Sequence, residues 1–264
     1  MIKLENYEVV GWKHAIRGMR NPMNSWDKSD SDYRTVLAEK CDKCGKYDLP
    51  APDSCTGCWI NNYEFRYHWP QFIIGPEDYK LMMKLRNAGN DHRKYMRMLV
   101  VYVDITAPLY WWKEFDTYKV GTVANSCSTM HKIHAKEFTL ADFSYENLLG
   151  IFNEDGTETG LIMDVSSAQD GSECFSPCGH MGNTVKMLNI CRNQYLKTKD
   201  KTCWDQMIQL LPTSYNQKRT VMLNYEVLAN IYKSRKNHKL AEWHALCNWI
   251  KELPYSEIIT GGEV

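Results

Sequence analysis

Four cysteines arranged as two Cys-x-x-Cys pairs restrict most strongly what this chain can fold into. Cys41 and Cys44 form one pair, Cys55 and Cys58 form the other, and ten residues separate the two pairs. Each pair places two thiolates on a tight turn, so two pairs can complete a tetrahedral zinc site with no open coordination position. The spacer is shorter than in the usual zinc ribbon, and four unligated cysteines in a loop are the alternative.

Residues 36–62, which surround these cysteines, are expected to form a small insert within the domain. A segment of this length buries too little apolar surface to fold alone, so a bound zinc ion would supply much of its folding free energy. Because a four-cysteine site is closed, we expect the zinc ion to be structural.

Composition excludes several classes of protein. The chain has 264 residues, 44% of them hydrophobic, with 32 basic and 32 acidic side chains, and it is expected to form one domain over residues 1–264. A net charge of zero argues against a general nucleic-acid or membrane coat, and no apolar run approaches the roughly 18 residues of a membrane span. Without the layout of a signal peptide, ten cysteines indicate a reducing compartment and a soluble, cytoplasmic protein.

Local patterns predict both strands and helices. The sequence MLVVYVDI is rich in β-branched and aromatic residues and predicts a buried strand near residues 98–106. Gly75-Pro76-Glu77 begins a predicted helix over 77–87, because proline fits the first turn and acidic residues favour the positive end of the helix dipole. Packing of the strand against this helix and the C-terminal helices predicts an α+β fold.

The C-terminal half is expected to be mainly helical. The sequence CWDQMIQLLP predicts a helix that Pro212 stops, and residues 220–250 predict two helices with a break near 236–239. Residues 153–183 carry much glycine and serine without periodicity, so we expect an irregular segment there.

The sequence NSCSTMH, residues 125–131, combines amide, hydroxyl, thiol and imidazole groups with almost nothing apolar. Such a stretch is either an exposed loop or the lining of a site. A weaker cluster follows at Cys174, Cys178 and His180, for which Cys191 or His131 is a candidate fourth ligand; ordinary loop residues are the more common explanation.

Asn224 and Arg235 return to nearly the same face of a predicted helix, eleven positions apart. Leu228 and Ile231 lie between them on the same stripe, so Arg235 is in line with core-facing residues. A buried arginine must find an anion. Either a carboxylate of the protein or a ligand phosphate would satisfy it.

Three segments resemble the flavin-dependent thymidylate synthases. LPTSYNQKRTVMLNYEVLANIYKSR and HKLAEWHALCNWIKELP resemble the C-terminal part of that family, and VVYVDITAPLYWWKEFDTYKVGTVANSCSTMH resembles its strand, Arg-Gln pair, Arg-His-Arg triplet and Asn-Glu-x-Ser-x-Arg-Tyr motif. The likeness covers residues 76–135 and 205–255. It implies a central, mostly antiparallel sheet packed against helices, and the cysteine insert is not a usual part of the family.

The chain departs from these motifs mainly by losing positive charge. Lys113-Glu114 replaces the Arg-Gln pair, Thr117-Tyr118-Lys119 replaces the triplet that grips the flavin phosphates, and Met130 replaces the nucleotide-binding arginine. No arginine fork is left there for a bidentate phosphate contact. Other cations that could compensate are Arg17, Arg20, His92, Arg93, Lys94 and His131.

The resemblance implies roles for individual residues and for ligands. Ser128 and Arg235 would be catalytic, Arg235, Ser128 and Thr129 would bind a nucleotide such as dUMP, and Asn224, Lys119 and Asn125 would bind FAD. Methylenetetrahydrofolate would donate the carbon, and four subunits would share active sites at their interfaces.

Two other hypotheses about the function are alternatives to this enzyme. A catalytically inactive relative would keep the fold as a nucleotide-binding or assembly module. Nucleic-acid modification would instead use DHRKYMR and KSRKNHK as phosphate contacts, although such basic runs are more often solvated helix faces.

Overall fold

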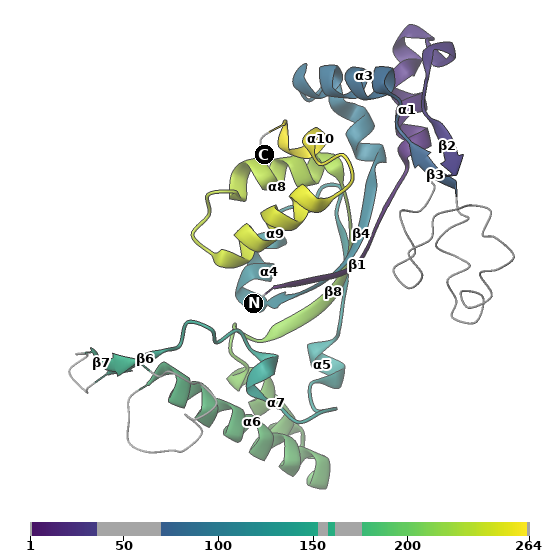
Figure 1. Ribbon diagram of the computed structural model, residues 1–264. Coiled ribbons are helices and arrows are strands. Elements are labelled where there is room, and N and C mark those ends of the chain that lie inside the picture. The colour runs from purple at the N-terminus through teal and green to yellow at the C-terminus, as the bar shows by residue number, and fades with distance from the viewer. Residues whose placement is uncertain (1, 36–69, 153–157, 162–175, 263–264) are drawn as a thin grey trace, which may run out of the picture.

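The computed structural model describes residues 2–35, 70–152, 158–161 and 176–262. Its centre is a four-stranded antiparallel sheet in the order β1-β4-β8-β5 (Figure 1), which confirms the α+β prediction. The strands of this sheet are β1 (Lys3–Val10), β4 (Val100–Pro108), β8 (Asn216–Asn224) and β5 (Val123–Ser126). Two short ribbons accompany it: β2 (Asp32–Thr35) with β3 (Pro70–Ile73), and β6 (Gly150–Phe152) with β7 (Glu158–Leu161).

One face of the central sheet is buried and the other is open. Val101 and Val103 of β4 lie opposite Leu223 and Val221 of β8, and all four are almost fully buried in the main core. The alternate residues point the other way, and Tyr102 there is 43% exposed. This alternation is the period-two pattern of a half-buried antiparallel sheet.

Helices cover the buried face (Figure 1). Trp111 of α4, Ile231 of α8 and Trp243 of α9 are fully buried in the same core as the sheet. None of the described helices is both long enough and apolar enough to span a membrane. The helices are α1 (Trp12–Arg20), α3 (Pro76–Asn87), α4 (Leu109–Phe115), α5 (Thr129–Lys132), α6 (Pro177–Thr198), α7 (Lys201–Leu210), α8 (Tyr225–Arg235), α9 (Ala241–Glu252) and α10 (Glu257–Thr260). Short 3-10 turns are η1 (Asn21–Met23), η2 (Trp26–Lys28), η4 (Arg93–Met98) and η5 (Leu140–Asp142).

The predicted strand near 98–106 and the predicted helix over 77–87 are confirmed as β4 and α3. The N-terminus of α3 is capped from a distance, because the Asp30 carboxylate accepts hydrogen bonds from the backbone N–H groups of Glu77 and Asp78. Gly75 makes this possible: a Cβ at that position would lie 2.2 Å from the Asp30 carboxyl carbon.

The helix predicted from residue 220 onwards is wrong in its first part, because residues 216–224 form β8. Gln217, Val221 and Leu223 are buried, whereas Thr220 between them is exposed. Toward the end of the strand, buried and less buried side chains therefore alternate with period two. The helix begins only at Tyr225, and the expected break after Arg235 is present.

A second, smaller core lies beside the main one. Phe143, Leu188 and Met207 are its fully or almost fully buried members, and α6 and α7 supply most of its surface. The helix predicted to stop at Pro212 is confirmed as α7. The expected irregular segment ends earlier than predicted, because α6 begins at Pro177 with Ser176 as a side-chain cap.

The ribbon of β2 and β3 brackets the cysteine-rich segment. Thr35 and Pro70 are direct partners in this ribbon, so the two ends of the intervening chain lie side by side. Such adjacent ends are what an insert requires. The expected zinc ligands themselves, Cys41, Cys44, Cys55 and Cys58, lie outside the described residues.

Candidate functional site

The segment 125–131 leaves the open edge of the central sheet. Asn125 belongs to edge strand β5 and lies opposite Thr220 of β8, and every residue of β5 is exposed. The chain then turns into the single-turn helix α5, which carries Thr129 and His131. The polar segment is therefore exposed along the edge of a rigid element.

Ser128 and His131 form a hydrogen-bonded pair. The Ser128 hydroxyl oxygen caps α5 by accepting from the His131 backbone N–H at 3.0 Å, and it lies 2.8 Å from His131 Nδ1. Both side chains are exposed. A neutral imidazole at this distance can accept the hydroxyl proton, which is the arrangement that activates a serine as a nucleophile or hydrogen-bond partner.

Gln217 clamps the backbone of this segment to the sheet. Its amide nitrogen donates to the carbonyl of Cys127 at 2.9 Å, and the Cys127 N–H donates to the carbonyl of Lys218. Arg219 Nε in turn donates to the Gln217 side-chain oxygen, and the Trp112 indole donates to the Gln217 carbonyl. Gln217 is 9% exposed, so these contacts fix the position of the segment.

Gln217 was not among the residues predicted from the sequence. The signal was available: with period two, Gln217 is in phase with Val221 and Leu223 and so belongs to the buried face of β8. A polar side chain at such a position needs a buried hydrogen-bond partner.

Arg235 is held by protein groups at the end of α8. Its Nη1 donates to Glu114 Oε2 at 2.9 Å, its Nε donates to the Tyr118 hydroxyl at 2.9 Å, and its guanidinium carbon lies 4.6 Å from the centre of the Trp243 ring. Glu114 Oε2 also accepts from the Trp243 indole. The side chain of Arg235 is 18% exposed. The carboxylate partner considered for this arginine is therefore Glu114.

Asn224 and Arg235 do not meet within one chain. Asn224 is the N-cap of α8, where its side-chain oxygen accepts from the Val227 N–H at 3.1 Å. Eleven residues of helix rise separate the two by about 16 Å. Within one copy of the chain, Asn224 and Arg235 therefore make separate contacts.

Asn224 lies instead beside the turn that follows Lys119. A Cβ at Gly121 would lie 2.8 Å from the Asn224 side-chain nitrogen, and Gly121 has a φ of +79° that favours glycine. Lys119 and Asn125 are both exposed next to this turn. The three residues expected to bind a cofactor, Asn224, Lys119 and Asn125, thus occur on neighbouring elements.

The second cysteine cluster does not converge in the part of the chain that the structure describes. Cys178 and His180 lie in the first turn of α6 and not in a loop, and two helical positions apart they point in nearly opposite directions. Cys191 is thirteen residues further along the same helix, about 20 Å away, so it cannot join Cys178. No group of three or more potential metal ligands occurs among the described residues; Cys174 lies outside them.

Comparison with known proteins identifies the fold. No protein-family profile matches the chain, and no curated protein sequence matches it. Two crystal structures of thymidylate synthase X from Helicobacter pylori with FAD and dUMP match with a TM-score of 0.56 at 15% identity, over 98% of this chain and 97% and 98% of theirs. The chain has the fold of a flavin-dependent thymidylate synthase.

A third solved structure also matches the chain. The UMP/dUMP methylase PolB from Streptomyces cacaoi, bound with 5-bromo-dUMP, matches with a TM-score of 0.52 at 12% identity, over 99% of this chain and 95% of that chain. At identities this low, the structural match shows a common fold and does not show a common reaction. The reaction has to be inferred from the residues themselves.

The residues expected to hold the FAD phosphates do not form a binding set in one copy of this thymidylate synthase fold. Lys119 is the single cation at the triplet position, and the Asn224 side-chain oxygen is used by the helix cap. Two phosphates would meet one exposed lysine there, which is too little charge for a tightly held pyrophosphate. FAD therefore does not fit these residues without cations from elsewhere.

Proposed function

We propose that the chain is a divergent flavin-dependent thymidylate synthase-like enzyme that transfers a one-carbon group, as methyl or a related group, to a pyrimidine deoxynucleotide such as dUMP. The observation that carries this proposal is the fold match over 98% of the chain to structures solved with FAD and dUMP. The clamped, exposed segment 125–131 supports it, because it offers polar groups at the edge of the sheet without a structural use for all of them.

In this proposal the polar segment orients the nucleotide. Ser128 contacts the base or the phosphate of the nucleotide. His131 accepts the hydroxyl proton of Ser128 when the serine oxygen serves as a nucleophile or hydrogen-bond partner. Thr129 and Asn125 add hydrogen bonds from the same edge. Arg235 would hold the phosphate after exchanging its contact with Glu114 for the ligand, so Glu114 competes with the substrate for the same guanidinium.

FAD and methylenetetrahydrofolate are the ligands that the resemblance implies. Because Lys119 is isolated at its position, the missing cations would have to come from another copy of the chain. The open face of the sheet favours such an assembly: Tyr102 and Val123, 43% and 61% exposed, both lie opposite Met222 on it. Homo-oligomerisation is therefore part of the proposal. The family resemblance implies that the oligomer is a tetramer.

The zinc insert and the cytoplasmic location complete the proposal. The pairing of β2 with β3 supports an insert over residues 36–62 that is closed by Cys41, Cys44, Cys55 and Cys58.

A catalytically inactive nucleotide-binding or assembly module is the second candidate. The ion pair between Arg235 and Glu114 favours it, because a satisfied arginine has a structural reason to be present. The two candidates differ in whether Arg235 binds a phosphate, and in whether the protein carries flavin.

The decisive experiment measures dUMP binding by titration calorimetry on the purified protein and on three variants. Arg235→Ala should abolish binding. Glu114→Gln should strengthen binding by about tenfold, because it removes the competing charge while keeping the shape of the side chain. Arg97→Ala is the matched control: Arg97 is also paired with a glutamate, Glu226, but it is 53% exposed and has no role in the proposal.

The visible spectrum of the same protein and a methylation assay with reduced FAD and methylenetetrahydrofolate separate the candidates. An enzyme should show a flavin absorption band and turnover. A colourless protein that binds dUMP without turnover would be the inactive module. Equal dUMP binding by Arg235→Ala and the parent would refute the contact between Arg235 and the phosphate that the enzyme proposal requires.

A further inference from the structure

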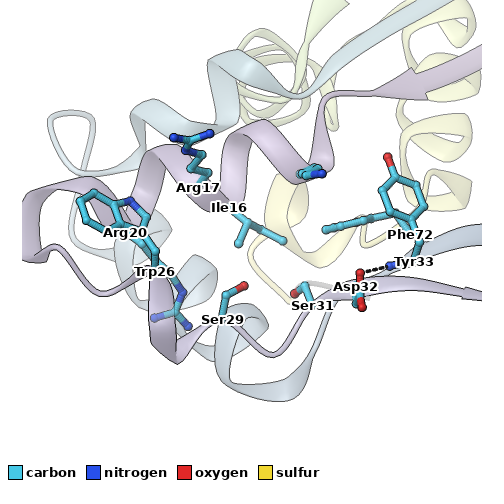
Figure 2. A pocket seen from close by; sticks show the side chains of 10 residues that line it. Ile16, Arg17, Arg20, Trp26, Ser29, Ser31, Asp32, Tyr33 and Phe72 are labelled. Carbon is cyan, nitrogen blue, oxygen red and sulfur yellow. Dashed lines mark hydrogen bonds between the residues drawn. The ribbon is translucent and has the colours of Figure 1, made fainter.

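A cavity of about 430 Å³ lies between helix α1 and the segment that leads into the β2–β3 ribbon. Figure 2 shows Ile16 and Arg17 of α1 on one side, Ser29 and Ser31 on the other, and aromatic rings toward the two ends. In Figure 1 this part of the molecule is at the opposite end from α5, so the cavity is separate from Ser128 and His131. Its volume is within the range of small-molecule sites.

One face of α1 brings three cations to the cavity. Lys13, Arg17 and Arg20 are spaced by four and three residues, so they share a helix face with Ile16. Arg20 is neutralised, because its Nε donates to Asp78 at 2.6 Å and the pair is almost fully buried. Lys13 and Arg17 are exposed and have no carboxylate partner among the residues that the structure describes.

Aromatic rings line both ends of the cavity. Trp26 is 49% exposed and Tyr33 is 51% exposed, which is unusual for large rings that line a concave surface. Tyr33 packs edge-on against Phe72 with ring centres 5.2 Å apart, and Lys13 Nζ lies 5.9 Å from the centre of the Tyr33 ring. The Trp26 indole is oriented by donating to Asn21. Both ends can therefore stack a planar ring.

The wall opposite α1 is rigid. The buried Asp78 carboxylate accepts hydrogen bonds from the Ser29 hydroxyl, from the Ser31 hydroxyl and from the backbone N–H groups of Asp30 and Ser31. Because these donors already bind Asp78, the wall offers a ligand a fixed surface and few free hydrogen-bond donors. A preformed wall lowers the entropy that a ligand loses on binding.

We propose that this cavity is a second ligand site, which binds a phosphorylated planar ring of the nucleoside monophosphate class. The ring stacks on Tyr33 or Trp26, and the phosphate binds between Arg17 and Lys13, the two cations that no described carboxylate neutralises. Asp32 also lines the cavity, with its carboxylate accepting from the Tyr33 N–H, and its negative charge repels a phosphate from the Tyr33 end. The volume of about 430 Å³ favours a small molecule over a nucleic-acid strand, and the inference does not depend on the proposed enzyme activity.

Titration calorimetry in the Arg235→Ala background tests this site without interference from the dUMP site. The probes are AMP, UMP, the matching nucleosides, inorganic phosphate and folic acid. AMP or UMP should bind saturably, and Arg17→Gln should weaken that binding by about tenfold or more, since a charge-assisted contact is lost. Nucleoside binding should be weaker than nucleotide binding and should not respond to this change.

Matched variants keep the result interpretable. His14→Gln, on the same helix but not lining the cavity, should leave nucleotide binding unchanged. Tyr33→Leu and Trp26→Leu are measured separately. The variant with the larger loss of nucleotide affinity identifies the aromatic side chain on which the ring stacks. All variants should melt within about 1 °C of the parent, because each side chain is exposed.

Three outcomes would overturn the proposal. The first is the absence of saturable nucleotide binding up to about 1 mM. The second is equal affinity of Arg17→Gln and His14→Gln. The third is tighter binding of folic acid than of either nucleotide, which would show that a carboxylate and not a phosphate is recognised.

Discussion

Replacing Asp78 with asparagine should destabilise this protein more than almost any other single change of similar size. The Asp78 carboxylate is fully buried and accepts five hydrogen bonds, one from Arg20 and four from the side chains and backbone of residues 29–31. Asparagine keeps the shape but loses the charge. The side-chain NH2 group of asparagine would face the N–H and hydroxyl donors that now bind the carboxylate. Arg20 would then be buried beside a neutral side chain that has one hydrogen-bond-accepting oxygen in place of two.

The expected loss follows from the burial of both partners. Arg20 is 5% exposed and Asp78 is 0% exposed, and removing one partner of a buried ion pair costs about 3–5 kcal/mol. This is a large part of the roughly 5–15 kcal/mol by which a domain is stable. At about 2–4 °C per kcal/mol for a chain of this length, the melting temperature should fall by about 6–20 °C.

Thermal and urea unfolding followed by circular dichroism measure this effect. Glu77→Gln is the control, because Glu77 is an exposed carboxylate in the same first turn of α3 and its loss should cost about 1 kcal/mol or less. Equal destabilisation by Asp78→Asn and Glu77→Gln would show that the buried pair of Asp78 and Arg20 does not stabilise the fold.

The pH dependence gives an independent check. Burial raises the pKa of Asp78, but hydrogen bonds from Ser31, Ser29 and Arg20 and the charge of Arg20 outweigh it and hold the pKa below its ordinary value. A carboxyl with a lowered folded-state pKa stabilises fully above its unfolded pKa, and this contribution is lost as the pH falls through the folded pKa. The gap in stability between parent and Asp78→Asn should therefore narrow below about pH 4.

Two further predictions concern the cap of α8 and the metal. Asn224→Ala should lower the free energy of unfolding by about 1 kcal/mol in urea, whereas Asn224→Asp should keep the cap and most of the stability, because only the alanine variant leaves the Val227 N–H without its acceptor. Metal analysis should find one zinc ion per chain, and Cys58→Ser should remove it while the main melting transition persists; absence of zinc from the parent would show that the four cysteines form a plain loop.

Local pattern was sufficient for several elements of the fold. Strand β4 and helix α3 lie where β-branched residues and a Gly-Pro-Glu start predicted them. These signals work because they act over one or two turns of chain. β8 was missed although its alternation is visible, because the helical pattern of α8 directly follows it and was extended backwards across Asn224.

The candidate site was predicted less completely than the fold. The resemblance singled out Ser128 and Arg235, but the pairing of Ser128 with His131 became visible only with the turn of α5 in place. The partner of Arg235 was not predictable. Glu114 lies 121 residues away in sequence, and its distance from Arg235 depends on how α4 and α8 pack on the sheet.

The sequence by itself determined the positions of β4, α3 and α7, and it shows that positive charge is missing from the triplet at 117–119. These properties depend on neighbouring residues and on composition. Only the tertiary structure decided that Arg20 is neutralised by Asp78, while no carboxylate of the described residues pairs with Arg17 on the same helix face. The reason is physical: the free energy of a charge depends on burial and on the distance to its partner, and both are set by segments that are far apart in the chain.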